Sequence, residues 1–468
     1  MTDYEEFIRS KRTADPPTGI ASASSIELNT KLFPFQKKIV HWALYRGRAC
    51  IWADCGLGKT AMQLEWARVV TEHARKPVMI VTPLAVSEQT AYIEAPKFGI
   101  RCKVVSTQDE LEDGINITNY EKLEKFDLSQ FGGVVLDESS ILKNYAGKIR
   151  NMILKRTASI PFRLACTATP APNDYMELGN HAEFVGAMNY NEMLAMFFVH
   201  DGGETAKWRL KGHARRDFFA WVASWAMFIR KPSDLGDSDD GFILPEIVFH
   251  RVTVKTEASP GNLFPVVAQT LQERQEARRD TIESRSESAA SVIGENKECD
   301  SDQFCVWCNL NAEAESVAAK RPGMVNIRGG DSNEFKTDAM LNFASGKLAE
   351  IVTKPKIAGF GMNWQNCHNV VFLGLSDSYE QFYQAVRRFY RFGQKHAVHI
   401  WIVTADTEGA VVENIRRKEH EANAMYAEML KYMNPENRIS ADFSAPQKSV
   451  YNPSRELELP PFLKGLAS

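Results

Sequence analysis

The segment that decides how the chain is interpreted is Ala53-Asp54-Cys55-Gly56-Leu57-Gly58-Lys59-Thr60. An apolar run, 49–52, precedes it, and a helix-forming run, 61–67, follows it. A strand, a glycine loop, a Lys-Thr pair and a helix are the parts of a phosphate-binding loop. The pattern therefore predicts a nucleotide site, although Ala53 stands where the usual pattern has glycine. The alternative is an ordinary strand-to-helix turn with a solvated lysine.

The residues of this loop have separate expected roles. The glycines let backbone N–H groups face phosphates, and the helix N-terminus adds partial positive charge. Lys59 is predicted to reach the β- and γ-phosphates of ATP, and the Thr60 hydroxyl to hold Mg²⁺. The predicted nucleotide contacts in this segment are Asp54, Cys55, Gly56, Leu57, Gly58, Lys59 and Thr60.

Composition limits the class of protein. A length of 468 residues suggests two to four domains, and a net charge of −3 argues against a protein that is basic over its whole surface. Any nucleic acid must then bind to a local patch. Eight scattered cysteines favour a reducing compartment, and Cys299, Cys305 and Cys308 lack the fourth ligand of a zinc site. No signal peptide and no membrane span is recognisable, so we expect a soluble, cytoplasmic protein in a bacterium or an infected host cell.

Short apolar runs alternate with helical patterns along most of the chain. This alternation predicts an α/β fold of two lobes, each a mainly parallel sheet flanked by helices. The expected strands lie near residues 49–52, 77–83, 103–105, 115–120, 133–136, 162–166, 247–254, 304–308, 323–327, 349–353, 369–373 and 399–403. The expected divisions are a tail (1–30), a first lobe (31–235) with a basic and aromatic insertion (184–232), an acidic linker (236–245), a second lobe (246–435) and a second tail (436–468).

Two further motifs would complete a hydrolysis site. Leu136-Asp137-Glu138 ends an apolar strand, where Asp137 is predicted to hold Mg²⁺ and Glu138 to deprotonate the attacking water. The alternative is a solvated acidic loop. Arg388 and Arg391 are spaced for one face of a predicted helix, where they would stabilise the charge that develops on the γ-phosphate. The alternative for them is a basic surface helix.

The order of these motifs resembles the helicases of superfamily two, and within it the Swi/Snf-type DNA translocases. The resemblance covers roughly residues 31–420. Residues 32–44 look like the glutamine motif, with Gln36 as its glutamine, and 54–60 like motif I. Residues 82–86 resemble motif Ia, and 117–121 resemble the "ITTYE" segment.

The later motifs continue the resemblance with some departures. Residues 137–144 are similar to "DEGHRIKN", with two serines in place of Gly-His, and residues 167–170 followed by Asn173 look like "TGTPLQN". Residues 356–364 resemble "AGGLGLNL" and 384–394 resemble "QAxDRAHRIGQ", with Arg387 in place of the aspartate. The resemblance implies two RecA-like lobes around ATP and Mg²⁺. It adds Gln36, Gly361 and Gln384 to the predicted nucleotide contacts and assigns the finger role to Arg388 and Arg391.

The resemblance also implies contacts to a nucleic-acid backbone, without sequence specificity. The candidate residues are Thr82, Thr118, Thr353 and Asn363, together with Lys207, Arg209 and Lys211 of the insertion. Capping or turn formation is the alternative for the first four. The aromatic residues Phe218 to Phe228 have the spacing of a core-facing helix rather than of a stacking surface.

The expected function is ATP-driven translocation on DNA, most simply duplex DNA. The alternatives are an RNA-directed enzyme of the same superfamily and an ATPase switch that loads a nuclease or replication partner. A replication, recombination or nuclease protein is the expected partner, and a membrane is not.

Overall fold

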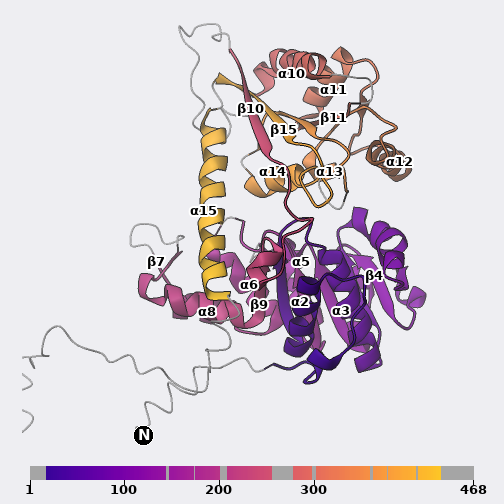
Figure 1. Cartoon of the computed structure of the whole chain (residues 1–468), viewed down its shortest axis with the longest axis vertical. Coiled ribbons are helices and arrows are strands. Elements are labelled where there is room, and N and C mark those ends of the chain that lie inside the picture. Colours follow the sequence, from indigo (N-terminus) through magenta and orange to yellow (C-terminus); the bar gives the residue numbers. More distant parts are fainter. Residues whose placement is uncertain are drawn as a thin grey trace, which may run out of the picture. The chain divides into compact units, whose positions relative to one another are not determined.

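The computed structural model describes residues 17–143, 147–172, 174–200, 208–255, 278–297, 302–358, 362–376, 378–406 and 409–433. Within these residues the strands form two parallel sheets and one small antiparallel hairpin (Figure 1). We call residues 17–235 the first lobe and residues 246–433 the second lobe. Each lobe contains one of the two parallel sheets, so the predicted α/β fold is confirmed.

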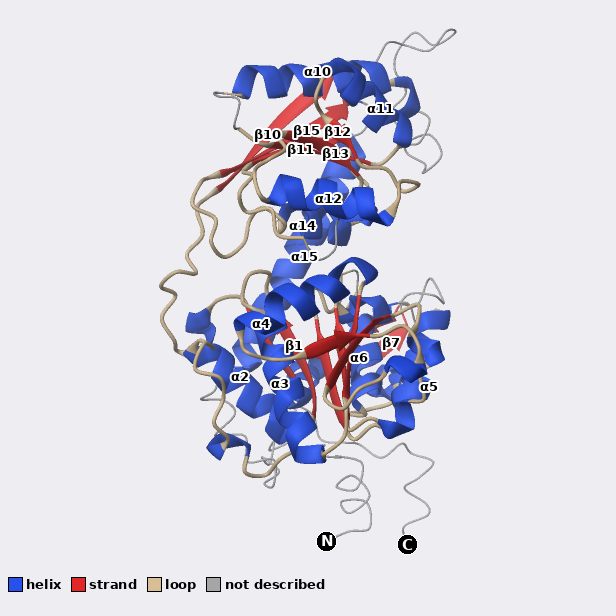
Figure 2. Ribbon diagram, turned by 90° about the vertical axis from the view of Figure 1, so that its right-hand side faces the viewer, coloured by secondary structure: helices blue, strands red, loops and turns tan. Residues whose placement is uncertain are grey.

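The first sheet has the order β3-β4-β2-β5-β6-β1-β9 in the described part of the chain, and every neighbouring pair is parallel. Most residues of its strands are buried because helices cover both faces (Figure 2). The strands are β1 (Arg48–Ala53), β2 (Val78–Thr82), β3 (Cys102–Val104), β4 (Ile115–Asn119), β5 (Gly133–Asp137), β6 (Phe162–Cys166) and β9 (Ala226–Ile229).

The helices of the first lobe pack on this sheet or on its edges. Helix α3 contacts β2, β5 and β6, whereas α6 contacts β1 and β6. A hairpin of β7 (Phe198–His200) and β8 (Trp208–Leu210) follows α7. The helices are α2 (Pro34–Arg46), α3 (Lys59–Ala74), α4 (Ala95–Lys97), α5 (Lys148–Thr157), α6 (Leu178–Val185), α7 (Tyr190–Phe197) and α8 (Arg215–Trp225).

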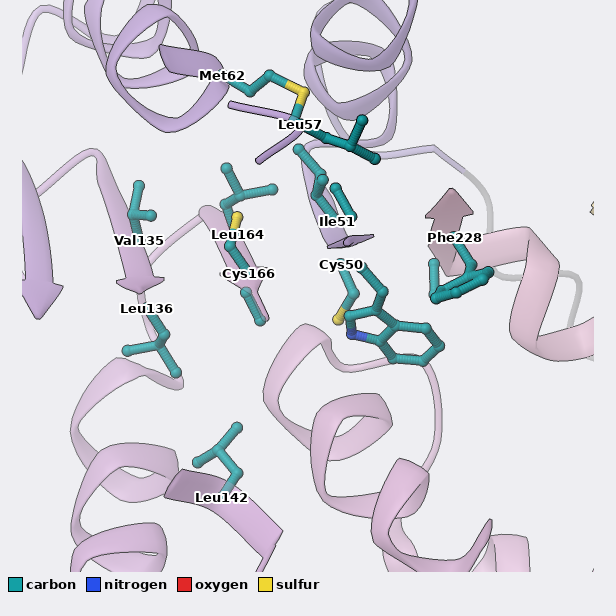
Figure 3. Close-up of a cluster of buried hydrophobic side chains, with 14 of the residues drawn as sticks. Cys50, Ile51, Leu57, Met62, Val135, Leu136, Leu142, Leu164, Cys166 and Phe228 are labelled. Atoms are coloured by element: carbon teal, nitrogen blue, oxygen red, sulfur yellow. The ribbon is translucent and has the colours of Figure 1, made fainter. Parts of the chain in front are cut away.

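The centre of the first lobe is a continuous apolar core between β1, β5, β6 and the helices (Figure 3). The β1 side chains are buried, and the Trp52 ring meets the Trp225 ring edge-on at 5.4 Å between centroids. Buried side chains on both faces of a strand fix its position in the sheet. This core therefore sets where β1 and β5 end, which is where the predicted phosphate loop and acidic pair begin.

The second sheet has the order β10-β15-β14-β11-β13-β12 among the described residues, and it is also parallel. Helices α10 and α11 lie on one face, and α12 and α14 on the other (Figures 1 and 2). No helix in the described ranges is long and apolar enough to cross a membrane. The elements are β10 (Ile247–Val254), β11 (Phe304–Cys308), β12 (Val325–Asn326), β13 (Glu350–Thr353), β14 (Asn369–Leu373), β15 (Val398–Ala405), α10 (Ile282–Asn296), α11 (Asn311–Lys320), α12 (Asn333–Ala344), α13 (Pro355–Ala358), α14 (Tyr379–Val386) and α15 (Gly409–Met433).

Strand β9 corrects one expectation. The aromatic spacing predicts a single helix through Phe228, but α8 ends at Trp225 and the chain continues directly as a strand beside β1. Four apolar residues, Ala226 to Ile229, fit either a helix end or a short buried strand. Pairing with β1 decides between them. The aromatic side chains themselves are buried, as predicted.

Two polar segments are also more ordered than expected. From residue 17 onward the predicted tail packs on the first lobe, with Ile20 and Leu28 buried and the Asn29 N–H donating to Glu65. Just before the linker, Asp234 accepts hydrogen bonds from the N–H groups of Arg230 and Lys231, and in the linker Asp239 accepts from the N–H and the hydroxyl of Ser233. These aspartates cap turns, which is a common role of short carboxylates. Residues 1–16 and 434–468 lie outside the described residues.

Helix α15 belongs to the second lobe in sequence but packs against α8 and β9 of the first. The Tyr426 ring stacks on Phe228 at 4.6 Å, and its hydroxyl donates to the Ala168 carbonyl at 3.1 Å. The Arg230 guanidinium lies 4.0 Å from the centroid of the same ring. Tyr426 thus joins the end of the chain's second half to the segment that follows β6.

Replacing Tyr426 separates these contributions. We expect Tyr426→Ala to lower stability by about 3–5 kcal/mol, as for other buried aromatic residues, and Tyr426→Phe by about 1 kcal/mol through the lost hydrogen bond. Thermal unfolding followed by circular dichroism measures both changes. Equal destabilisation by the two variants would contradict the role given to ring stacking.

Candidate functional site

The phosphate loop has the geometry that the sequence predicts. It connects β1 to α3, and Gly56 and Gly58 have φ values of +90° and +78°. A Cβ at Gly58 would lie 2.3 Å from the Gln36 amide nitrogen, and one at Gly56 would lie 2.7 Å from the backbone nitrogen of Phe392. Both positions therefore require glycine, for conformation and for space.

Neighbouring segments fix the loop on two sides. The Gln36 side chain donates to the Leu57 carbonyl at 2.9 Å and accepts from the Phe33 N–H at 3.0 Å. On the other side, the Asp54 N–H donates to the Ile229 carbonyl at 2.9 Å. Gln36 thus supports the loop, and β9, which the sequence did not reveal, holds its first residue.

The Lys59 ammonium group donates to the carbonyl of Ala53 at 2.9 Å and lies 3.5 Å from that of Asp54. These carbonyls belong to the loop that Lys59 itself follows. A lysine in this position can move to a phosphate by side-chain rotation alone. Thr60 is the second residue of α3 and is partly exposed, so its hydroxyl is accessible from the loop.

Asp137 and Glu138 stand where β5 ends, beside the phosphate loop. Asp137 accepts a hydrogen bond from Gln63 of α3 at 2.8 Å, and its carbonyl accepts from the Tyr120 hydroxyl at 2.6 Å. Glu138 has φ +56°, a left-handed conformation that few residues other than glycine adopt. Such strain is typical of functional positions, where surrounding contacts stabilise it.

Burial raises the pKa of both carboxyl groups. The pKa of Glu138 rises to about 7, because burial outweighs the opposing effect of Lys59 and the Asp137 charge adds to it. Burial also raises the pKa of Asp137, against the Gln63 hydrogen bond and Lys59. A carboxylate with a pKa near neutrality is suited to accept a proton at cellular pH.

One face of α14 joins the second lobe to these motifs. Glu380 pairs with Lys143, the Tyr383 hydroxyl donates to Asp54, and Gln384 donates to Glu138 at 2.9 Å. Arg387, directly after the helix, pairs with Asp54 at 3.0 Å. Positions i, i+3, i+4 and i+7 lie on the same side of a helix. The sequence shows this spacing, but of these four residues the motif resemblance predicted only Gln384 as part of the site.

The expectation that Arg388 and Arg391 lie on a helix is wrong. Helix α14 ends at Val386, and both arginines follow it in turns. Arg388 donates to the Met362 carbonyl at 3.3 Å, and burial lowers its pKa to about 10. Burial also lowers the pKa of Arg391, against the nearby Cys55 and Glu94. The backbone of Arg391 lies beside the phosphate loop, since its carbonyl carbon would be 3.6 Å from a Cβ at Gly56, and Arg388 keeps its charge at neutral pH.

Gln394 explains why the chain leaves the helix. Its side-chain amide nitrogen lies within hydrogen-bond distance of three carbonyls, those of Gln365, Cys367 and Phe389, at 2.9–3.3 Å. Its oxygen accepts from the N–H groups of residues 395 and 396. A buried glutamine with this many partners holds the turn in place. The sequence marked Gln394 only as part of a motif.

Most of the described candidate nucleic-acid contacts are hydrogen-bonded within the chain. Thr82, Thr118 and Thr353 are buried, and their hydroxyls donate to the carbonyls of Pro83, Val105 and Ile327. The Asn363 side chain accepts from the N–H of residue 365, Lys211 donates to the carbonyls at the end of α7, and Arg209 lies exposed on β8. This geometry favours the structural alternative for the threonines. Lys207, Gly361, Asn144 and Asn173 lie outside the described residues.

The described residues fit a magnesium-bound nucleotide. The loop provides glycines with positive φ, Lys59 can turn toward a phosphate, and the buried Asp137 carboxylate lies next to the loop. No cluster of three or more His, Cys, Asp or Glu occurs in the described part of the chain. Mg²⁺ is usually held by one or two protein oxygens plus substrate phosphates, so Thr60 and Asp137 are a sufficient set.

Residues 289–393 match the helicase conserved C-terminal domain. This stretch contains β11 to β14, α14 and both arginines. The second lobe is therefore similar to the C-terminal domain of helicases over these residues. The first lobe carries the phosphate loop and acidic pair, and the matched part of the second lobe carries the arginines.

Individual relatives of this chain are distant. It is 22% identical to protein p41 of Acyrthosiphon pisum secondary endosymbiont phage 1, over 85% of this chain and 98% of that protein. It is 20% identical to a SWI/SNF-related matrix-associated actin-dependent regulator of chromatin, subfamily A-like protein 1, of Drosophila melanogaster, over 95% of this chain but only 62% of that protein. The SWI2/SNF2 ATPase core of Sulfolobus solfataricus, solved with double-stranded DNA, shares 18% identity over 87% of this chain and 98% of that chain, with a TM-score of 0.40.

The raised pKa of Glu138 predicts a pH-dependent stability. In the unfolded chain the carboxyl is ionised above its ordinary pKa of 4.5, whereas the folded state keeps it neutral up to about pH 7. The contribution of Glu138 to stability is therefore lost as pH rises from about 4.5 to 7, by about 3 kcal/mol in all. Glu138→Gln should remove this loss.

Thermal unfolding of the wild type and of Glu138→Gln at pH 5 and pH 8, without nucleotide or Mg²⁺, checks this prediction. We expect the variant to gain stability relative to the wild type at pH 8 and not at pH 5. The matched control is Glu124→Gln, which makes the same change at an exposed glutamate. The same difference at both pH values would contradict a buried, partly neutral Glu138.

Proposed function

We propose that this chain is a DNA-stimulated ATPase that couples ATP hydrolysis to translocation on duplex DNA. The observation that carries the proposal is the hydrogen bond from Gln384 of the second lobe to Glu138 of the first. It brings the candidate general base against the same helix that leads into Arg388 and Arg391. Groups needed for hydrolysis therefore come from two lobes, and their separation or approach can be coupled to movement.

The proposed roles of the residues follow from their positions. Lys59 and the loop N–H groups bind the phosphates, and Thr60 and Asp137 hold the Mg²⁺ that neutralises them. Glu138, oriented by Gln384 and Thr167, accepts the proton of the attacking water. Arg391 and Arg388 stabilise charge on the transferred phosphoryl group from the second lobe.

The resemblance of the motifs to Swi/Snf-type DNA translocases supports duplex DNA as the track, as does the likeness to a chromatin regulator. The net charge of −3 means that contact with DNA depends on local groups rather than on the overall field. The similarity to a phage protein supports an enzyme that works with partner proteins in the cytoplasm of a bacterium or infected host.

Two substitutions test hydrolysis. Lys59→Ala should abolish ATP binding, and Glu138→Gln should keep binding but reduce DNA-stimulated turnover at least ~100-fold, as expected for loss of a general base. The exposed residues Lys125 and Glu124 provide the matched controls Lys125→Ala and Glu124→Gln. Unchanged turnover in Glu138→Gln would rule out the assigned base.

Arg391 has a different expected signature. Arg391→Ala should reduce turnover by roughly 10³-fold or more, while the Kd for ATP changes far less, because an arginine finger acts mainly on the transition state. Steady-state kinetics and equilibrium binding of a fluorescent ATP analogue separate the two effects. A loss confined to binding would assign Arg391 to nucleotide capture instead.

The nature of the track needs its own experiment. ATP turnover measured with duplex DNA, single-stranded DNA and RNA should be stimulated most by duplex DNA. With ATP, the enzyme should displace streptavidin from the end of biotinylated duplex DNA. Strongest stimulation by RNA would favour the RNA-directed alternative, and turnover without displacement would favour a switch that loads a partner.

A further inference from the structure

The carboxylate of Asp54 is surrounded by partners from both lobes. Its Oδ1 accepts from the Cys55 N–H at 2.6 Å and from the Tyr383 hydroxyl, and its Oδ2 accepts from Arg387 at 3.0 Å. The Asp54 side chain is only 12% exposed. Both carboxylate oxygens of Asp54 thus accept hydrogen bonds. Two of the three donors, Tyr383 and Arg387, lie more than 300 residues away in sequence.

Arg387 is held as closely as its partner. Its guanidinium lies 4.9 Å from the centroid of the Tyr383 ring and 5.4 Å from that of Tyr390, and the side chain is 19% exposed. Burial alone would lower the pKa of Arg387, but the Asp54 carboxylate, together with Tyr383 and Cys55, outweighs it and raises the pKa. A planar guanidinium confined between aromatic rings is positioned for one partner.

The identity of residue 387 matters here. The motif that residues 384–394 resemble has an aspartate at this position, and an aspartate facing Asp54 would repel it. This chain instead has an arginine next to its finger candidate Arg388. The Asp54–Arg387 ion pair can therefore hold the segment that contains Arg388 and Arg391 at the phosphate loop without the help of a phosphate.

We propose that Asp54 and Arg387 form an ion-pair latch that docks the second lobe on the phosphate loop before nucleotide binds. Tyr383 completes the latch through its hydroxyl and its ring. Arg387 is thus a positioning residue: it acts through Asp54, whose N–H and carbonyl are part of the loop that would surround the phosphates. Breaking the latch populates open arrangements, and only the docked fraction is competent to bind.

Small-angle X-ray scattering of the full chain, without nucleotide or DNA, tests the latch directly. Asp54→Asn keeps an oxygen for the Cys55 N–H but removes the charge, and Arg387→Gln removes the guanidinium. Each should increase the radius of gyration, and Arg387→Glu should increase it most because two carboxylates then face each other. Arg417→Gln on exposed α15 is the control and should leave the radius unchanged.

A double-mutant cycle decides whether the two residues act together. Asp54→Asn/Arg387→Gln should open the chain no further than either single variant. Circular dichroism tests whether each variant is folded. If Asp54→Asn does not fold, Arg387→Glu still tests the latch. Wild-type scattering in all variants, or additive opening in the double variant, would overturn the proposal.

The kinetic consequence rests on the proposed function, whereas the scattering experiment does not. Arg387→Gln should raise the KM for ATP at least about 5-fold, the lower end of typical coupling between sites, with a smaller change in kcat. A loss confined to kcat would overturn the positioning role. If the chain hydrolyses no ATP at all, the proposed function fails, but opening in Arg387→Gln would still establish the latch.

Discussion

The organisation of the site depends on one face of a short helix. Glu380, Tyr383 and Gln384 of α14, with Arg387 directly after it, contact Lys143, Asp54 and Glu138 of the first lobe. A single helix that bonds both the phosphate loop and the acidic pair fixes the distance between them and the arginines that follow. Each sheet supports its own motifs, and this helix face contacts both the phosphate loop and the acidic pair.

This arrangement gives a physical basis for coupling hydrolysis to motion. Glu138 is half-buried, strained and bonded to Gln384, so separating the lobes would remove this partner and expose the carboxylate further to water. Approach of the lobes restores the dry site in which its pKa is near 7. In the proposed mechanism, chemistry and lobe position would affect each other through these side chains.

Much of this could be predicted from the sequence, for reasons that particular residues illustrate. The phosphate loop could be predicted because backbone geometry dictates its local pattern of Gly56, Gly58 and Lys59. The two sheets could be predicted because their strands are short apolar runs. The position of Arg388 could not be predicted, because Gln394 bends the chain through carbonyls 5 to 29 residues away. Strand β9 is equally a matter of tertiary context, since four apolar residues become a strand only beside β1.

The central claim is that nucleotide is contacted from both lobes. The most direct measurement is an experimental structure of the full chain with Mg²⁺, ADP and aluminium fluoride, which mimics the transferred phosphoryl group. The account predicts Lys59 and Glu138 on one side of the fluoride, Arg391 on the other, and the contacts of α14 retained. A nucleotide bound by the first lobe alone, with the arginines remote from the fluoride, would contradict it.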